Sequence, residues 1–211
     1  MPSLLATVFV RLTVAPVVGW LAALATLLSS VPQVLRLLRG HRAGVVPASY
    51  VAWLVASLSW TFWAADVGAL PSLVVNALSV PVLLIAVALL RPRPRLTSLA
   101  GLGLVAALLL RTHPAILASF ASVVLLFVAL PSLRHALRPH ADLSGVAPST
   151  WVLLAANNTL WVIYDVCIGH PFAGIASLAL AILALAVLFR LRRTRDASRS
   201  SSSVIAGQTA Q

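Results

Sequence analysis

The sequence predicts an all-α membrane protein with seven transmembrane helices, arranged as two parallel three-helix bundles joined by a linker helix. Three observations predict this fold: an apolar composition, arginines that gather in the short loops between apolar runs and in the tail, and an internal repeat. Of the 211 residues, 61% are hydrophobic and 9% are charged, and the mean hydropathy is +1.02. Because a soluble domain carries roughly 25% charged residues, this composition excludes an ordinary soluble domain.

Seven apolar segments supply the expected spans. Each is bounded by Pro, Gly or Arg residues, and most approach the roughly 20 residues that cross a bilayer as a helix. The fourth is the weakest, since it is the shortest run between arginines. The segments cover residues 16–38, 44–65, 71–90, 96–112, 115–133, 146–165 and 171–189.

The arginines set the expected orientation. The formal charge of +11 comes from 15 Arg, and 13 of these lie in the loops after the first, third and fifth segments or in the tail. Only Arg11 and Arg111 lie on the other side. The positive-inside rule therefore predicts an N-terminus outside and a C-terminus in the cytoplasm, which an odd number of spans satisfies. This role explains the basic charge without a nucleic-acid partner. The absence of lysine and the Ala/Leu/Arg bias suggest a bacterial plasma membrane.

An internal repeat divides the chain. Residues 31–90 and 130–189 align with a two-residue insertion in the second basic loop, and matched positions beyond that loop lie 101 residues apart. An odd number of helices per unit would invert the second copy, so we interpret the fourth segment as a linker that keeps the copies parallel. The matched residues are Gly44 and Gly145, Pro47 and Pro148, Trp60 and Trp161, and Gly68 and Gly169. The expected organisation is an extracytoplasmic N-terminus (1–15), a first unit (16–90), a linker (91–114), a second unit (115–190) and a disordered cytoplasmic tail (191–211).

These residues resemble a known superfamily. Pro32-Gln33 near the end of the first segment, the basic loop, the entry to the second segment at Pro47, and Trp60 followed by Asn76 resemble the PQ-loop superfamily. The 3+1+3 layout resembles the SWEET sugar transporters (MtN3/saliva type), whose half-size bacterial relatives are the SemiSWEETs. The resemblance implies transport of mono- or disaccharides by alternating access. In the second unit a serine, not a glutamine, follows Pro131.

Polar and aromatic residues inside the spans are the candidate binding groups. An Asn in mid-span is costly without a partner, and its amide suits a pair of sugar hydroxyls. An indole face can cover the C–H face of a sugar ring, although interhelical bonding and packing are the alternatives for both residue types. Residues spaced three or four before each tryptophan share its helix face. The predicted substrate-binding residues are Trp60, Asn76, Trp161, Ser177, Asn157 and Ser57.

Two further sets complete the predicted pathway. The resemblance implies an inner gate with hinges at prolines in the cytoplasmic halves of the helices, with Gln33 bonding a freed carbonyl; the alternative is that each proline marks a helix end. Aromatic and acidic residues at the outer ends of the second and sixth spans are the expected outer gate, although solvated boundary residues are the alternative for the carboxylates. The inner set is Pro32, Gln33, Pro47, Pro131 and Pro148, and the outer set is Trp63, Asp66, Tyr164 and Asp165.

The sequence favours a carrier over an enzyme. The spans contain no nucleophile–base pair, phosphate loop or cluster of metal ligands, so neither catalysis nor a cofactor is expected. Facilitated diffusion of a sugar is the leading hypothesis. The alternatives are a proton-coupled PQ-loop carrier of amino acids or other small polar solutes, and a non-transporting membrane receptor or scaffold. The expected partners are the small polar solute and the lipid bilayer, and a homo-oligomer is possible.

Overall fold

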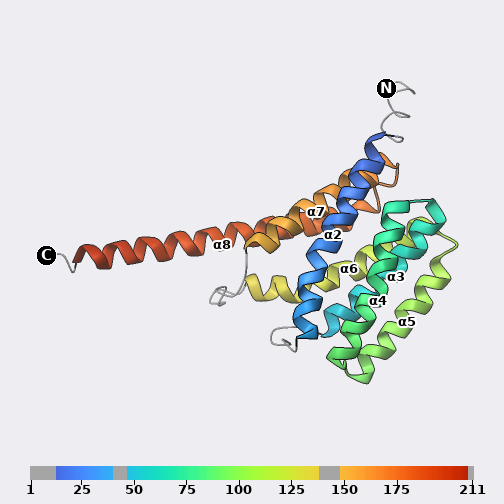
Figure 1. Cartoon of the computed structure of the whole chain (residues 1–211), viewed down its shortest axis with the longest axis horizontal. Coiled ribbons are helices and arrows are strands. Elements are labelled where there is room, and N and C mark those ends of the chain that lie inside the picture. Colours follow the sequence, from blue (N-terminus) through green and yellow to red (C-terminus); the bar gives the residue numbers. More distant parts are fainter. Residues whose placement is uncertain (1–12, 40–46, 138–147, 209–211) are drawn as a thin grey trace.

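The computed structural model describes residues 13–39, 47–137 and 148–208, and within these ranges the regular structure is helical, with no strand (Figure 1). The all-α prediction is confirmed. Most helix ends lie within four residues of the predicted segment ends. The helices are α2 (Ala15–Leu38), α3 (Pro47–Val67), α4 (Leu70–Leu90), α5 (Pro94–Leu110), α6 (Pro114–Leu137), α7 (Pro148–Cys167) and α8 (Gly174–Gln208).

The last helix differs most from the prediction. The tail 191–211 is expected to be disordered, whereas α8 continues to Gln208 and projects beyond the other helices (Figure 1). Its 35 residues make a helix about 52 Å long. The physical reason is local, because residues 175–206 contain neither Pro nor Gly and are rich in Ala, Leu and Arg, which favour helix. The helix also begins at Gly174, three residues after the predicted start, because turn hydrogen bonds hold the chain before it.

The helix contacts follow the same order in both halves of the chain. In the first half α4 contacts both α2 and α3, and in the second half α8 contacts both α6 and α7. Among the described residues, α2 has no close backbone contact with α3, nor α6 with α7. The halves meet where α2 contacts α7 and where α3 contacts α6, and α5 packs against α3 and α6. Each half therefore places its third helix between its first two.

Two glycines show the same correspondence in the backbone. Gly68, just after α3, has φ 71°, and Gly169, after α7, has φ 83°. This left-handed conformation at the end of a helix favours glycine because it has no Cβ. The two are matched in the sequence repeat, so the repeat extends to the conformation of the turn.

One helix in the described part of the chain is long and apolar enough to cross a membrane. It is Leu70–Leu90, with a mean hydropathy of 2.7, and 22% of its apolar window is buried, so most of its surface faces outward. By length and composition alone this identifies one candidate span. The shorter apolar stretches are Ala15–Ser29, Pro94–Leu110, Pro114–Val128 and Gly174–Arg190.

Candidate binding cavity

A cavity of about 380 Å³ lies among the helices. Its walls come from α2, α3, α4, α6, α7 and α8, and α5 contributes none of the described lining. Much of the lining consists of residues at matched positions of the repeat, which places the cavity between the two halves of the chain. These matched pairs include Tyr50 and Trp151, Trp53 and Leu154, Ser57 and Asn158, Trp60 and Trp161, and Asn76 and Ser177. Before the basic loop the two copies are offset by 99 residues, as at Pro32 and Pro131, and extending that offset towards the N-terminus also pairs Thr26 with Leu125 and Ser29 with Val128.

The cavity brings together all six residues predicted to bind substrate. Ser57, Asn157 and Ser177 are buried, and the other three are partly exposed within the cavity. The structure shows that these residues line the same cavity, whereas their contact with a solute stays a prediction. The six lining residues are Trp60, Asn76, Trp161, Ser177, Asn157 and Ser57.

A hydrogen-bonded cluster joins α2 to α7 at the cavity wall. The Trp161 indole Nε1 donates to the Thr26 hydroxyl at 3.0 Å, and that hydroxyl lies 3.1 Å from Oδ1 of Asn157. The same hydroxyl lies 2.9 Å from the Ala22 carbonyl oxygen. Because a hydroxyl carries one hydrogen, it donates to Asn157 or to Ala22 at any moment, but it can accept from Trp161 throughout.

The matched tryptophan lacks this anchor. Trp60 corresponds to Trp161, but the position matched to Thr26 is Leu125, which has no hydroxyl. In the described part of the chain the Trp60 indole makes no hydrogen bond, and its ring instead meets Trp63 edge-on at 5.2 Å between centroids. The two tryptophans are therefore not equivalent, because only the Trp161 N–H has a hydrogen-bond partner among the described residues.

The two polar lining residues of the first half, Asn76 and Ser57, differ in their hydrogen bonding. The Asn76 amide donates to the Ser72 carbonyl oxygen at 2.9 Å and lies 3.3 Å from the Ser72 hydroxyl, so its donor side is held within α4. Ser57 is 1% exposed, and its hydroxyl has no hydrogen-bond partner among the described residues. A buried hydroxyl without a partner is unusual in a protein interior, and Ser57 is also one of the residues that line the cavity.

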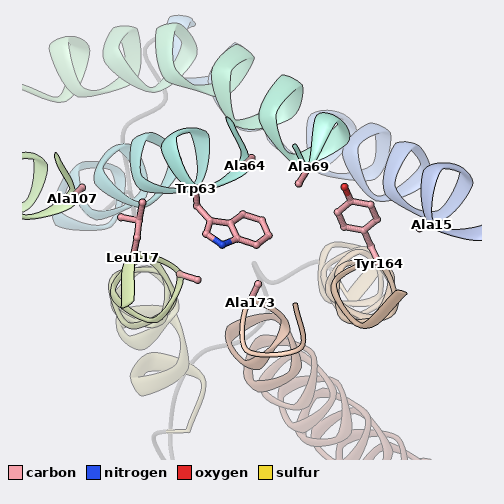
Figure 2. Packing of buried hydrophobic residues seen from close by; sticks show 9 residues of the cluster. Ala15, Trp63, Ala64, Ala69, Ala107, Leu117, Tyr164 and Ala173 are labelled. Atoms are coloured by element: carbon pink, nitrogen blue, oxygen red, sulfur yellow. The ribbon is translucent and has the colours of Figure 1, made fainter. Parts of the chain in front are cut away.

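An apolar layer packs against one part of the cavity lining, through Trp60, Trp161 and Ala173. Trp63 and Tyr164, at matched positions, are 1% and 2% exposed and belong to one packed cluster with alanines from neighbouring helices. Figure 2 shows Trp63 in the middle of this layer, with Leu117 on one side and Ala173 and Tyr164 on the other. Neither residue is part of the cavity lining. The contact of Trp161 with Tyr164, at 5.7 Å, repeats that of Trp60 with Trp63.

The two carboxylates predicted at this end have different surroundings. Asp66 is exposed, does not line the cavity, and forms an ion pair with Arg111 at 3.0 Å. Asp165 is 5% exposed and lines the cavity. The repeat offset explains the difference, because Asp165 corresponds to Ala64, and Asp66 to Cys167. They are not a matched pair.

The predicted inner-gate residues are placed only in part. Pro47 and Pro148 are the first residues of α3 and α7, where a missing N–H removes no helical hydrogen bond, so they mark helix starts. Pro32 and Gln33 lie within α2 and Pro131 within α6, but their side chains, like that of Pro148, are outside the described part of the structure.

Several lining residues were not predicted. They include Thr26 and a second layer of aromatic side chains, of which Tyr50 and Trp151 occupy matched positions. Applying the repeat offset to every aromatic residue would have found that pair, whereas Thr26 has no sequence signal of this kind. Among the described residues no cluster of His, Cys, Asp or Glu could hold a metal ion.

Comparison with known proteins does not assign the chain to a family. No protein-family model matches it, and no curated protein matches it either.

Proposed function

We propose that this protein is a membrane transporter that carries a small polyhydroxylated solute, a mono- or disaccharide, by facilitated diffusion. The observation that carries the proposal is the cavity between the two halves, lined by matched residues, with the apolar layer of the matched pair Trp63 and Tyr164 packed against it. A volume of about 380 Å³ suits a small solute. The sequence resemblance to the SWEET transporters supports the same function.

The proposal places all seven helices in a membrane as a 3+1+3 arrangement, with the N-terminus outside. The outward surface supports this, because large apolar side chains are exposed along several helices. On α5 they form one face, and at positions three or four apart they would meet lipid. The α5 residues are Leu99, Leu102, Val105 and Leu109. In this arrangement α5 is the linker helix and the basic end of α8 lies in the cytoplasm.

Alternating access would use the contacts between the halves. These contacts run from α2 to α7 and from α3 to α6, so rocking one half against the other changes both interfaces together. With the Trp63–Tyr164 layer packed, the solute reaches the cavity from the other end. Opening that layer would expose Trp60 and Asn76 to the outside and release the solute there.

Proton-coupled transport is the second candidate, and one observation favours it. Asp165 places a buried carboxylate on the cavity wall, where a proton could be taken up and released. Asp66 gives no such support, because it is exposed and paired with Arg111. An inward proton gradient that accelerates solute uptake, with the acceleration lost in Asp165→Asn, would favour this candidate over facilitated diffusion.

Flux through proteoliposomes tests the leading function. Purified protein should move radiolabelled glucose or sucrose down its gradient, and the double variant Trp60→Ala, Asn76→Ala should abolish this flux. Trp20→Ala is the matched control, since Trp20 is exposed on α2 outside the cavity and its loss should leave flux unchanged. Unchanged flux in the double variant would refute the site, and no flux of sugars or amino acids would favour a receptor or scaffold.

A further inference from the structure

The cavity wall has a charge imbalance. Asp165 is the one acidic residue in the described lining, and that lining contains no Arg, Lys or His. The carboxylate is 5% exposed, and no described residue forms a hydrogen bond or ion pair with it. A buried carboxylate without a counter-ion is costly, so the Asp165 carboxyl keeps its proton unless an occupant of the cavity brings a positive charge to it.

The neighbours of Asp165 do not supply that charge. A Cβ built at Gly174 would lie 3.6 Å from Oδ2 of Asp165, so the carboxylate lies against the first residue of α8 and receives at most the partial positive charge of a helix N-terminus. His170 donates its backbone N–H to the Asp165 carbonyl oxygen, but its ring meets Trp63 edge-on at 5.6 Å. Arg111 is held by the other carboxylate, Asp66.

Aromatic rings supply the second part of a cation site. The lining contains four tryptophans and one tyrosine, and the tryptophan nearest to Asp165 in the sequence, Trp161, lies four residues before it on the same helix, α7. Aromatic faces attract ammonium groups, most strongly where water is excluded. The aromatic lining residues are Tyr50, Trp53, Trp60, Trp151 and Trp161.

We propose that the cavity selects solutes that carry a protonated amine beside hydroxyl groups, such as an amino sugar or an amino alcohol, with Asp165 as the counter-ion of the amine. The hydroxyls of the solute would donate to the amide oxygen of Asn76 and accept from the indole N–H of Trp60, for which the structure shows no partner among the described residues. An anionic solute would find no counter-ion in the described lining. This selectivity rests on the proposed transport function, because it names the class of solute that the same cavity takes.

Matched solutes test the selectivity without any variant. Glucose, glucosamine and glucuronate differ by one substituent each and are respectively neutral, cationic and anionic below the pKa of the amine. Binding is measured by quenching of tryptophan fluorescence in nanodiscs, and flux in proteoliposomes. We expect glucosamine to bind at least about tenfold more tightly than glucose, the effect of one desolvated charge pair. Glucuronate should bind more weakly than glucose.

The variant Asp165→Asn assigns the selectivity to one residue. It should bring glucosamine and glucose within about threefold of each other, while Asp66→Asn, which alters the exposed carboxylate, should preserve the tenfold preference. If Asp165→Asn does not fold, Asp165→Glu replaces it and should retain the preference.

Two results would overturn the inference. One is equal binding of glucosamine and glucose to the unaltered protein, and the other is a preference that survives in Asp165→Asn. Glucose flux without an amine preference would refute this inference alone and leave the transport proposal intact. Selective binding of glucosamine without flux of any solute would refute transport and leave the cation site standing.

Discussion

The variant Thr26→Val tests the hydrogen-bonded cluster that joins the two halves at the cavity. Valine keeps the shape of threonine but removes the hydroxyl that accepts from Trp161 at 3.0 Å and lies 3.1 Å from Asn157. Interhelical hydrogen bonds in membrane proteins contribute about 0.6 kcal/mol on average and up to about 1.7 kcal/mol. Loss of two should lower the free energy of unfolding by about 1–2 kcal/mol, as the bond to the Ala22 carbonyl is a local alternative that adds little.

The assay is denaturant unfolding in mixed micelles, followed by circular dichroism. Thr159→Val is the matched control on α7, because the only bond of the Thr159 hydroxyl within the described part of the chain is to the Ala155 carbonyl of its own helix, at 2.8 Å. The control should lose less than about 0.5 kcal/mol, in line with the small effect of such back-bonding. Equal losses in Thr26→Val and Thr159→Val would show that the cluster does not hold the halves together.

Three further substitutions test other features of the fold. Gly19→Ala should cost about 1–3 kcal/mol in unfolding free energy, because its Cβ would lie 2.6 Å from Cε2 of Tyr164. Gly101→Ala, with nothing within 4 Å, should cost nothing, and equal effects in the two alanine variants would contradict this packing. Gly68→Ala should cost about 1–2 kcal/mol through its φ of 71° alone, with Gly68→Asn less damaging; a neutral alanine would refute the left-handed turn. Asp66→Asn should leave glucose flux unchanged, since that carboxylate lies outside the cavity, and a loss of flux would place it on the pathway after all.

The helices were predictable from sequence because apolar runs between Pro, Gly and Arg coincide with single structural elements. The gathering of the six binding candidates in one cavity follows from the repeat, which marks positions such as Trp60 and Trp161 as equivalent. The end of α8 was not predictable from composition, because serine-rich polar sequence suggests disorder while the lack of Pro or Gly permits a helix.

The asymmetric features of the cavity were harder to predict. Thr26 forms hydrogen bonds with Asn157 and Trp161, which lie 131 and 135 residues further along the chain, and no pattern in the sequence around Thr26 indicates these contacts. The distinction between Asp66 and Asp165 was available in the sequence. Both residues lie near the outer end of a predicted span, which suggests that they are equivalent. The repeat offset instead matches Asp165 with Ala64 and shows that they are not. The position of each aspartate within its own span was therefore a poorer guide to equivalence than the alignment of the two repeats.

The lone carboxylate of Asp165 has a consequence for how such a cavity can evolve. Two identical half-length chains would present every acidic residue twice, and two close carboxylates would repel each other across the axis. A single chain that holds both halves is free of this constraint, since Ala64 can stay small while its counterpart becomes acidic. A single chain thus permits an ionised carboxylate on one side of the cavity alone, and under the transport that we propose its field would favour one orientation of a dipolar solute.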